Sequence, residues 1–444
     1  MITRYETPEM AALWSEDAKF HSWLLVEKTV ALVQAELGLI PVKAARAIQR
    51  ATFSIREIDR FERETNHDVI AFTRSVAKSI GAPGKYVHYG LTSYDVVDTA
   101  LSLRCVSALE ILEAALGDLK VQTARLALEH KRTPMIGRTH GVHAEPITFG
   151  LKCLSWYEET QRNIERVRSA IEEMRFGKIS GVVGSYTQLS PAVEEKVLKR
   201  LGLKTEPVST QVIPRDRHAH MLSVLALVAT GLERIATEIR NLQRTEIGEV
   251  LEPFARGQRG SSAMPHKQNP ITCERVASLA RLVRAYAGVG MENICLWHER
   301  DLSNSANERV TIPEATTLTH YMLRKLTAVL AGLVVRPDRM LANLESSGQA
   351  FFSQAVMLEL VRVGMDKDAA YRLVQSLAFE CLASGGSLPE RCRRHPEITR
   401  RLDRRTLDRA FDLKRLLRNV DAVYRRVGLT PAVPRPARST KSRH

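Results

Sequence analysis

Residues 95–130 read DVVDTALSLRCVSALEILEAALGDLKVQTARLALEH and contain no proline. Apolar residues recur in this stretch mostly every three or four positions, at Leu101, Leu103, Val106, Leu109, Leu112, Leu116, Leu119, Ala124 and Leu128. This spacing is typical of an amphipathic α-helix, one face of which packs against a core. At 1.5 Å of rise per residue, such a helix would be about 50 Å long.

Four further stretches carry the same long helical pattern, and strand patterns are scarce. They cover roughly residues 147–175, 215–250, 271–298 and 312–335. Because an average protein helix has only about 11–12 residues, five helices of this length predict an elongated all-α bundle. Their apolar stripes are wide enough to face more than one neighbour, which predicts an oligomer. We expect Pro337 to end the fifth long helix.

The lengths of the helical patterns divide the chain into three domains and a tail. Shorter helical pieces predict a small N-terminal helical domain over residues 1–94. The long helices predict a central bundle domain over residues 95–342, and short helices return in a C-terminal helical domain over residues 343–430. Residues 431–444, PAVPRPARSTKSRH, predict a disordered basic tail.

The positive charge of the chain is concentrated at its C-terminal end. The 444 residues carry a formal net charge of +15, of which residues 391–444 supply +12, with seventeen Lys and Arg against five Asp and Glu. The tail could touch nucleic acid weakly through phosphates. We favour a solvated tail without a specific partner, so no specific nucleic acid is expected.

Composition also bears on localisation, membranes and metals. The sequence contains no run of 18 apolar residues, so no transmembrane helix is predicted. The N-terminus lacks the apolar core of a signal peptide, and a cytoplasmic protein is therefore expected. The six cysteines form no CxxC pair, and no HExxH motif occurs. We therefore expect no disulfide framework and no metal site.

A polar loop over residues 257–270 interrupts the long helical patterns. Residues 258–270 read QRGSSAMPHKQNP, with no helical or strand period, glycines that give flexibility, and two prolines that punctuate it. An ordinary connection between helices is the alternative reading. The density of Ser, His, Lys and Asn favours a mobile catalytic lid.

Three more polar islands lie near expected helix ends, at residues 66–69, 88–95 and 137–145. Helix ends leave backbone N–H groups unpaired and favour anions. Thr92-Ser93 precedes the first long helix, where it would be both a helix cap and an anion cradle. Capping alone would explain Ser93, but it would not explain His88, Thr92 and Ser93 together.

Two basic islands complete the set of candidate site residues. The first, residues 211–217, opens a long helix, and we expect its two arginines to form interhelical salt bridges. In the second, Arg300 and Arg309 with Ser303 and Ser305 form a candidate phosphate clamp, because guanidinium groups suit phosphate. There is no catalytic-triad order, P-loop or dinucleotide motif. The islands together predict a site for a polyanionic small molecule, with acid–base catalysis and no cofactor.

Several motifs resemble a known family. The loop GSSAMPHKQNP (residues 260–270) resembles the signature of the fumarase/aspartase superfamily. Within it, further segments resemble the adenylosuccinate lyase family: MITRY (1–5), NHDVIAFT (66–73), VHYGLTS (87–93), GRTHGVHAEP (137–146) and WHERD (297–301). The resemblance extends from Met1 to about residue 430 and leaves out only the tail.

The resemblance implies a fold and a reaction. The fold would be a three-domain, all-α fumarase/aspartase-like fold, in a homotetramer with a core of twenty long helices and active sites each built from three subunits. The reaction would be a β-elimination that releases fumarate from adenylosuccinate, giving AMP, and from succinylaminoimidazole carboxamide ribotide in purine biosynthesis. A related lyase that acts on another succinyl-type substrate is the alternative. An idle superfamily member is disfavoured, because Ser261, His140 and Lys267 are all present.

The resemblance also implies roles for individual residues. Ser261 would be the general base, His140 the general acid, and Glu274 the carboxylate that orients His140. Lys267 and Asn269 would hold the succinyl carboxylates. The remaining substrate-binding residues would be Thr92, Ser93 and Gln211 beside the succinyl group, His67 and Asp68 in the nucleotide site, Ser262 and Met264 in the loop, and Arg4, Tyr5, His88, Arg300, Ser305 and Arg309 around the phosphate.

Three positions depart from the family pattern. Arg is expected at Gln268, His at Asn304, and Ser or Gly at Cys273. None of them is assigned a chemical step, so they bear on substrate detail rather than on the reaction type. The second histidine of the third island, His143, is expected to be a structural hydrogen-bonding residue.

Overall fold

The computed structural model describes residues 2–254, 257–258, 260 and 262–430. The predicted tail over residues 431–444 therefore lies outside the described residues. The chain divides into two compact units. The first comprises Met1–Leu119, Gln161–Ala236 and Thr272–Thr327, and the second comprises Lys120–Thr160, Thr237–Ile271 and Ala328–His444.

Short helices begin the first unit. They are η1 (Thr3–Tyr5), α1 (Pro8–Trp14), α2 (Glu16–Glu36), α3 (Val42–Gln49), α4 (Ile55–Thr65), α5 (Asp68–Ile80) and η2 (Ala82–Tyr86). Their apolar faces meet in a buried aromatic cluster, in which the rings of Phe20 and Phe72 stack with centroids 5.7 Å apart. Ile58 and Val69 are buried in the same core, so α2, α4 and α5 pack as one body.

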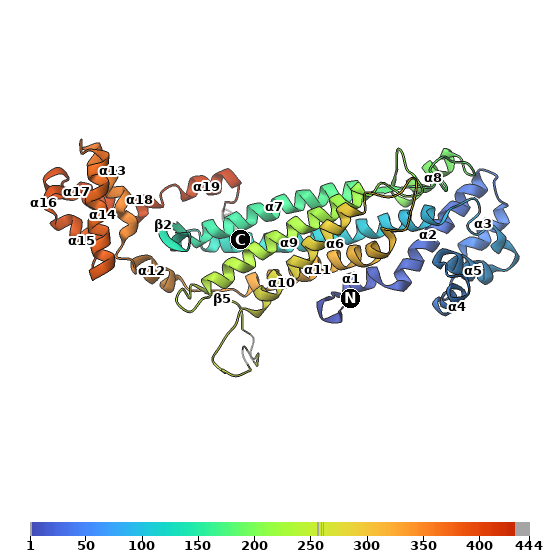
Figure 1. Ribbon diagram of the computed structural model, residues 1–444, viewed down its shortest axis with the longest axis horizontal. Coiled ribbons are helices and arrows are strands. Elements are labelled where there is room, and N and C mark those ends of the chain that lie inside the picture. Colours follow the sequence, from blue (N-terminus) through green and yellow to red (C-terminus); the bar gives the residue numbers. More distant parts are fainter. Residues whose placement is uncertain (1, 255–256, 259, 261, 431–444) are drawn as a thin grey trace, which may run out of the picture. The chain divides into compact units, whose positions relative to one another are not determined.

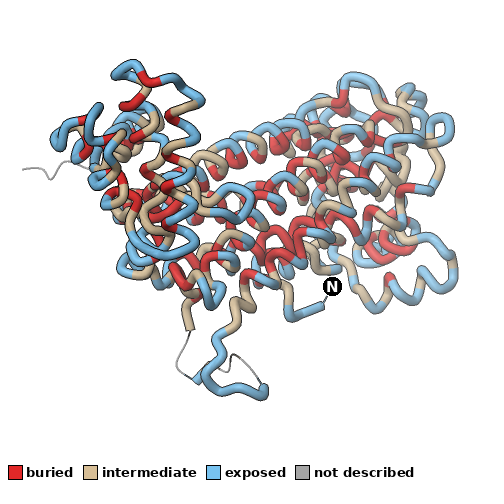
Figure 2. Tube along the Cα trace, turned by 60° about the vertical axis from the view of Figure 1, so that its left-hand side comes forward, coloured by how far each residue is buried: buried red, intermediate tan, exposed pale blue. Residues whose placement is uncertain are grey.

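Five long helices follow, as the sequence predicts (Figure 1). They are α6 (Ser93–Glu129), α7 (Phe149–Met174), α9 (Asp216–Leu242), α10 (Ile271–Glu292) and α11 (Ser305–Ala331), with the shorter α8 (Pro191–Leu201) between α7 and α9. Side-chain contacts join neighbours in the first unit: Arg168–Glu113 joins α7 to α6, Arg217–Glu173 joins α9 to α7, Arg284–Glu233 joins α10 to α9, and Tyr286–Glu314 joins α10 to α11. Buried residues recur along these helices (Figure 2). The predicted all-α class is confirmed.

By its length and composition, helix α9 is apolar enough to cross a membrane, because an 18-residue segment of it has a mean hydropathy of 1.3. That segment is 61% buried inside the protein, as expected for a core helix. Among the residues that the structure describes, α9 is the one helix with such a segment.

Several predicted helix ends are wrong. Helix α9 stops at Leu242 rather than near residue 250, because a turn with Gly248 at φ 62° leads into strand β5 (Val250–Leu251). Helix α10 stops at Glu292 rather than near residue 298, and α11 begins at Ser305 rather than near 312, with Pro313 inside it.

The prediction that Pro337 ends the fifth long helix is also wrong. Helix α11 ends at Ala331, and strand β6 (Val334–Val335) pairs antiparallel with β5. Pro337 is instead the first residue of α12 (Pro337–Glu345). A proline is tolerated there because the first helical N–H needs no partner within the helix.

A β-hairpin in the second unit was not predicted. The island at residues 137–145 was expected at a helix end, but it lies on strands β1 (Pro134–Thr139) and β2 (Val142–Thr148), which pair antiparallel. Its alternation of polar residues is too short to separate a strand from a loop by pattern alone. In the first unit, β3 (Phe176–Gly177) and β4 (Lys204–Thr205) form a short parallel pair.

The C-terminal helices have a core of their own. They are η3 (Ala350–Phe352), α13 (Ser353–Arg362), α14 (Lys367–Ser384), α15 (Leu388–Arg394), α16 (Pro396–Arg401), α17 (Arg404–Ala410), α18 (Leu413–Leu416) and α19 (Val420–Val427). Val356, Leu360, Val374 and Leu388 are among the buried residues of this core. All six cysteines are free thiols, and only Cys295 is exposed.

A buried ion-pair network ties three elements of the first unit together. Arg215, immediately before α9, donates from Nη1 and Nη2 to the carboxylate of Asp98 on α6, at 2.7 and 2.8 Å. Its Nε donates to Glu308 Oε1 on α11 at 3.0 Å. Burial alone would raise the pKa of Asp98, but the guanidinium of Arg215 lowers it. The salt bridges predicted for Arg215 and Arg217 are confirmed.

Replacing Arg215 by methionine would leave the carboxylates of Asp98 and Glu308 buried without a counter-charge. Because breaking a buried ion pair from one side costs about 3–5 kcal/mol, we expect Arg215→Met to lower the free energy of unfolding by that amount. Urea unfolding at fixed protein concentration measures the change. The control is Arg200→Met, whose pair with Glu36 is 40% and 44% exposed and should matter little. Equal stability of the two variants would contradict this account of the network.

Candidate active site

The most telling side chain in the first unit is Arg300. Its guanidinium carbon lies 3.6 Å from the centroid of the Tyr94 ring, a cation–π contact. Its Nε, Nη1 and Nη2 atoms are buried and have no hydrogen-bond partner among the residues that the structure describes. Burying charged donors without an acceptor is costly, so this arrangement is suited to an anion that would accept from them.

Tyr94 connects Arg300 to a second anion-binding feature. Its hydroxyl hydrogen-bonds to Ser305 Oγ at 3.0 Å, and Ser305 is the first residue of the 27-residue helix α11. The N-terminus of a long helix attracts negative charge. Tyr94, at the start of α6, therefore contacts the guanidinium of Arg300 with its ring face and the hydroxyl of Ser305 with its own hydroxyl.

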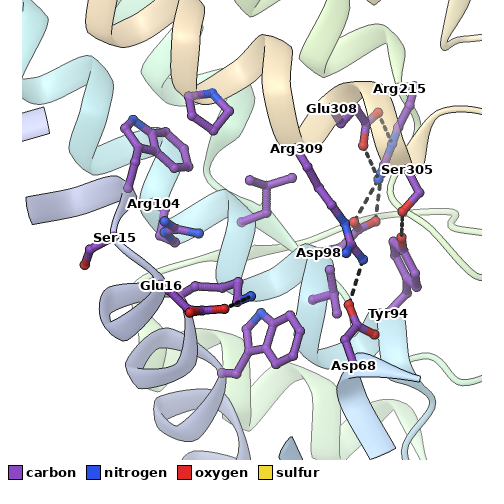
Figure 3. A pocket seen from close by; sticks show the side chains of 16 residues that line it. Ser15, Glu16, Asp68, Tyr94, Asp98, Arg104, Arg215, Ser305, Glu308 and Arg309 are labelled. Carbon is purple, nitrogen blue, oxygen red and sulfur yellow. Dashed lines mark hydrogen bonds and ion pairs between the residues drawn. The ribbon is translucent and has the colours of Figure 1, made fainter. Parts of the chain in front are cut away.

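A pocket of about 280 Å³ opens beside these groups (Figure 3). Arg309 reaches across it and pairs with Asp68 at 2.7 Å. The polar side contains Asp68, Tyr94, Ser305 and Arg309, and the apolar side includes Trp14 and Trp23. Three of the predicted substrate-binding residues, Asp68, Ser305 and Arg309, are thus brought together, and Arg300 adjoins them through Tyr94.

His88 is held by a partner that the sequence analysis missed. Its backbone N–H and its Nδ1 both contact the carboxylate of Glu27, at 2.9 and 2.6 Å, and Glu27 is only 3% exposed. Burial alone would lower the pKa of His88, but the Glu27 carboxylate raises it. The available signal was a charged residue within the apolar run Trp23-Leu-Leu-Val-Glu27 of α2.

Thr92 and Ser93 lie at the start of α6, as predicted. The backbone N–H of Thr92 donates to Asp95 Oδ2 at 2.9 Å, which is one half of a capping box. Neither hydroxyl hydrogen-bonds to another residue in the described part of the chain. Asp95 is fully buried and also contacts Lys178, so capping accounts for Asp95 and leaves the two hydroxyls for another role.

The other predicted residues of the first unit are more dispersed. His67 caps α5 by accepting from the N–H of Ile70 at 3.4 Å. Gln211 donates from Nε2 to the carbonyl of Val182 at 3.1 Å, and its backbone N–H donates to the carbonyl of Glu299, next to Arg300. Neither His67 nor Gln211 lines the pocket, and nor do Arg4, Tyr5 and Glu274: Arg4 and Glu274 are exposed, and the ring of Tyr5 meets Tyr321 edge-on.

In the second unit, His140 occupies the tip of the β1–β2 hairpin. His140 and Gly141 both have positive φ, 55° and 79°, as the two central residues of a type I′ turn require. A histidine in this conformation is strained, and such strain is typical of functional sites. The residue is exposed, so its imidazole is presented outward on a two-residue turn.

The loop after β5 is folded back on itself. Asn269 Nδ2 donates to the carbonyl of Gly260 at 2.9 Å, and a Cβ on Gly260 would lie only 2.1 Å from the carbonyl oxygen of Lys267. Only glycine fits at such a close backbone approach. Lys267 is exposed, as are Ser262 and Met264. Ser261 lies outside the described residues.

The three departures from the family pattern have structural places. Asn304 is fully buried and donates to Glu308 Oε1 at 3.0 Å, and Cys273 is buried in α10. The carbonyl of Gln268 accepts a hydrogen bond from Gln243 at 3.0 Å. The histidine expected to be structural, His143, has its pKa lowered by burial and by Arg138.

Comparisons with known proteins identify the family of the chain. Residues 3–285 match a family model described as lyase, and residues 349–427 match one described as adenylosuccinate lyase C-terminus. An adenylosuccinate lyase of Thermotoga maritima is 48% identical, over 96% of this chain and 99% of its own length. One of Bacillus subtilis is 45% identical, over 97% of this chain and 100% of its own length.

Solved structures give the same result for the fold. A fumarate lyase from Mesorhizobium sp. BNC1 superposes with a TM-score of 0.87 at 27% identity, over 96% of this chain and 98% of its own. The 3-carboxy-cis,cis-muconate lactonizing enzyme of Pseudomonas putida superposes with a TM-score of 0.86 at 28% identity, over 96% of this chain and 97% of its own. Together with the sequence relatives, which match over nearly the whole chain, these findings show that the chain belongs to the adenylosuccinate lyase family.

Proposed function

We propose that this chain is a carbon–nitrogen lyase that releases fumarate by β-elimination from adenylosuccinate, giving AMP, and from succinylaminoimidazole carboxamide ribotide. The observation that carries the proposal is the buried guanidinium of Arg300, which has no hydrogen-bond partner among the described residues. This guanidinium stacks on the ring of Tyr94, and the Tyr94 hydroxyl hydrogen-bonds to Ser305. A nucleotide 5′-phosphate supplies the anion that these donors require. The family supplies the reaction.

The hard step of this reaction is removal of a proton next to a carboxylate. The resulting carbanion carries extra charge on its aci-carboxylate, which fixed cations and N–H donors must stabilise. We assign Ser261 as the base, with Lys267 and Asn269 as the groups that hold the succinyl carboxylates. A serine is a weak base in water, so it must be activated in an enclosed site.

The loop must change before Asn269 can take this role. Its amide already donates to the carbonyl of Gly260 at 2.9 Å, within the loop itself. A substrate carboxylate would replace that carbonyl as the acceptor, and the loop would lose the contact that holds it folded back. We propose that this exchange accompanies closure of residues 257–270 as a lid.

His140 is proposed as the general acid that protonates the departing nitrogen. Its exposed place on a two-residue turn leaves the imidazole unencumbered, and Glu274 would select one tautomer by accepting from its ring N–H. His67 and Asp68 would line the nucleotide site, and Arg4, Tyr5 and His88 would bind the phosphate or its surroundings. Thr92, Ser93 and Gln211 would contact the succinyl group.

The proposed assembly is a cytoplasmic homotetramer with active sites shared between subunits and with no metal or cofactor. Large apolar side chains on the long helices of the first unit support association. Leu227 on α9, Leu282 on α10 and Val310 on α11 are 52%, 46% and 50% exposed. Exposed apolar residues on several adjacent helices are typical of an interface.

The reaction and its base are tested together with purified protein and adenylosuccinate, without added metal. We expect fumarate and AMP in equal amounts. Ser261→Ala should bind the substrate with nearly unchanged affinity but lose most turnover, because the base acts in the transition state. The matched control is Ser262→Ala, the neighbouring loop serine, which should lose much less. No fumarate from a folded protein, or full turnover by Ser261→Ala, would reject the corresponding assignment.

Arg300 separates a nucleotide substrate from other succinyl compounds. Arg300→Met keeps much of the side-chain volume that stacks on Tyr94 but removes the charge. We expect a loss of about 2–4 kcal/mol in transition-state stabilisation, so kcat/KM for adenylosuccinate should fall about 30- to 1,000-fold. Thermal unfolding should be unchanged or improved, since a buried unpaired cation is removed. An unchanged kcat/KM would favour the related lyase that acts on a different succinyl compound.

Shared sites predict recovery of activity on subunit mixing. His140→Ala and Ser261→Ala tetramers should each be nearly inactive. After dissociation and reassembly together, some sites would take His140 from one chain and Ser261 from the other, and activity should return. Mass spectrometry of differently tagged chains verifies mixing. Absence of recovery in demonstrably mixed tetramers would count against sites shared in this way.

A further inference from the structure

The hairpin that carries His140 is interrupted just before its tip. Ile136 pairs with Pro146, but the next pair is Arg138 with His143, so the register shifts at Gly137. A Cβ on Gly137 would lie 2.7 Å from the carbonyl oxygen of Glu145, which makes glycine necessary there. Beyond the irregularity, only two residue pairs support the turn. Such a short ribbon is marginal by itself, and a bulge gives it a point about which to pivot.

The side chain of Arg138 ties this outer part of the hairpin to a buried carboxylate. Arg138 Nη2 donates to Glu249 Oε1 at 2.8 Å, and Nη1 donates to Glu249 Oε2 at 3.1 Å. The Glu249 side chain is fully buried, and that of Arg138 is 16% exposed. The two parallel bonds fix both the position and the orientation of the guanidinium.

Glu249 is itself immobilised from three directions. Its backbone N–H donates to the carbonyl of Leu242 at the end of α9, at 2.9 Å, and its carbonyl accepts from the N–H of Arg336 at 3.0 Å. Its Oε1 also accepts from Asn343 Nδ2 on α12 at 2.8 Å, and the same amide donates to the carbonyl of Ile247 at 2.8 Å. The carboxylate is therefore a rigid fixed point for Arg138.

We infer that Arg138 and Glu249 are positioning residues that aim His140 at the substrate. The inference rests on the proposed role of His140 as general acid. Arg138 lies two residues before His140, on the tip side of the bulge, so its anchor limits the pivot of the turn. Proton transfer to a leaving group requires placement within a fraction of an ångström, which an exposed two-residue turn does not provide unaided.

An alternative role for the pair is to position the catalytic loop. Glu249 immediately precedes β5, which leads into residues 257–270. A purely stabilising role is a second alternative. Kinetics separate a positioning role from a purely stabilising one, because misplacement of a catalytic group lowers kcat at every site, whereas loss of fold lowers the amount of active protein without changing the properties of each remaining site. Subunit mixing then separates the hairpin from the loop.

The first test compares single variants with adenylosuccinate as substrate. Arg138→Met should lower kcat on the order of 10- to 100-fold, with KM changed little, and Arg138→Lys should recover part of the loss. Arg339→Met is the matched control. Arg339 donates to the carbonyls of Ile247 and Glu246, and among the described residues it has no hydrogen bond or ion pair with the Glu249 carboxylate or the hairpin, so kcat should be kept. Equal kcat values for Arg138→Met, Arg339→Met and the natural chain would overturn the inference.

Subunit mixing shows which catalytic group the pair serves. Arg138→Met mixed with Ser261→Ala should regain activity, and Arg138→Met mixed with His140→Ala should not, because every site would then carry a defective hairpin. The reverse pattern would assign the pair to the loop and overturn the inference. If His140→Ala keeps full turnover, the proposed acid fails and the inference with it. If His140→Ala is inactive and Arg138→Met is normal, the inference alone fails.

Discussion

The geometry of the first unit depends on the buried ion pairs that Arg215 forms with Asp98 and Glu308. Tyr94 lies one helical turn before Asp98 on α6, and Ser305 lies one turn before Glu308 on α11. Residues one turn apart lie on the same face of a helix. By locking Asp98 and Glu308 to one guanidinium, the network therefore holds the starts of α6 and α11 together, where the hydroxyls of Tyr94 and Ser305 hydrogen-bond. Arg300 contacts the ring of the same Tyr94.

The second unit also contains a buried ion pair, here close in sequence to an exposed side chain. Glu249 is a carboxylate without solvent contact, and His140, the proposed general acid, is exposed two positions beyond its arginine partner. In both units the costly buried ion pair has a location that a gain in stability alone does not explain. Its effect is to hold short polar segments, which have little packing of their own, on rigid helical and strand supports.

The sequence predicts the parts of this structure that depend on local periodicity. All five long helices are present, and α6 begins and ends within two residues of the predicted range. A helix boundary was mispredicted where one residue type is compatible with two positions in a helix. Proline is common both just after a helix and at its first residue, and Pro337 is the first residue of α12. The pairs Glu27–His88 and Arg138–Glu249 join residues 61 and 111 positions apart. Such pairs are set by tertiary packing, which no local pattern encodes.

Two groups of the proposed site differ in their readiness. Arg300 has buried donors without an acceptor among the described residues, so in the proposed phosphate site the desolvation cost of this arginine is already met by the fold. Asn269 is instead engaged by Gly260, so the loop end must exchange one acceptor for another before it can serve. Binding energy released at the phosphate is thereby available for closing the loop, although the phosphate takes no part in bond breaking. A substrate that lacks the phosphate would then lose turnover as well as affinity, because the loop would close less often around it.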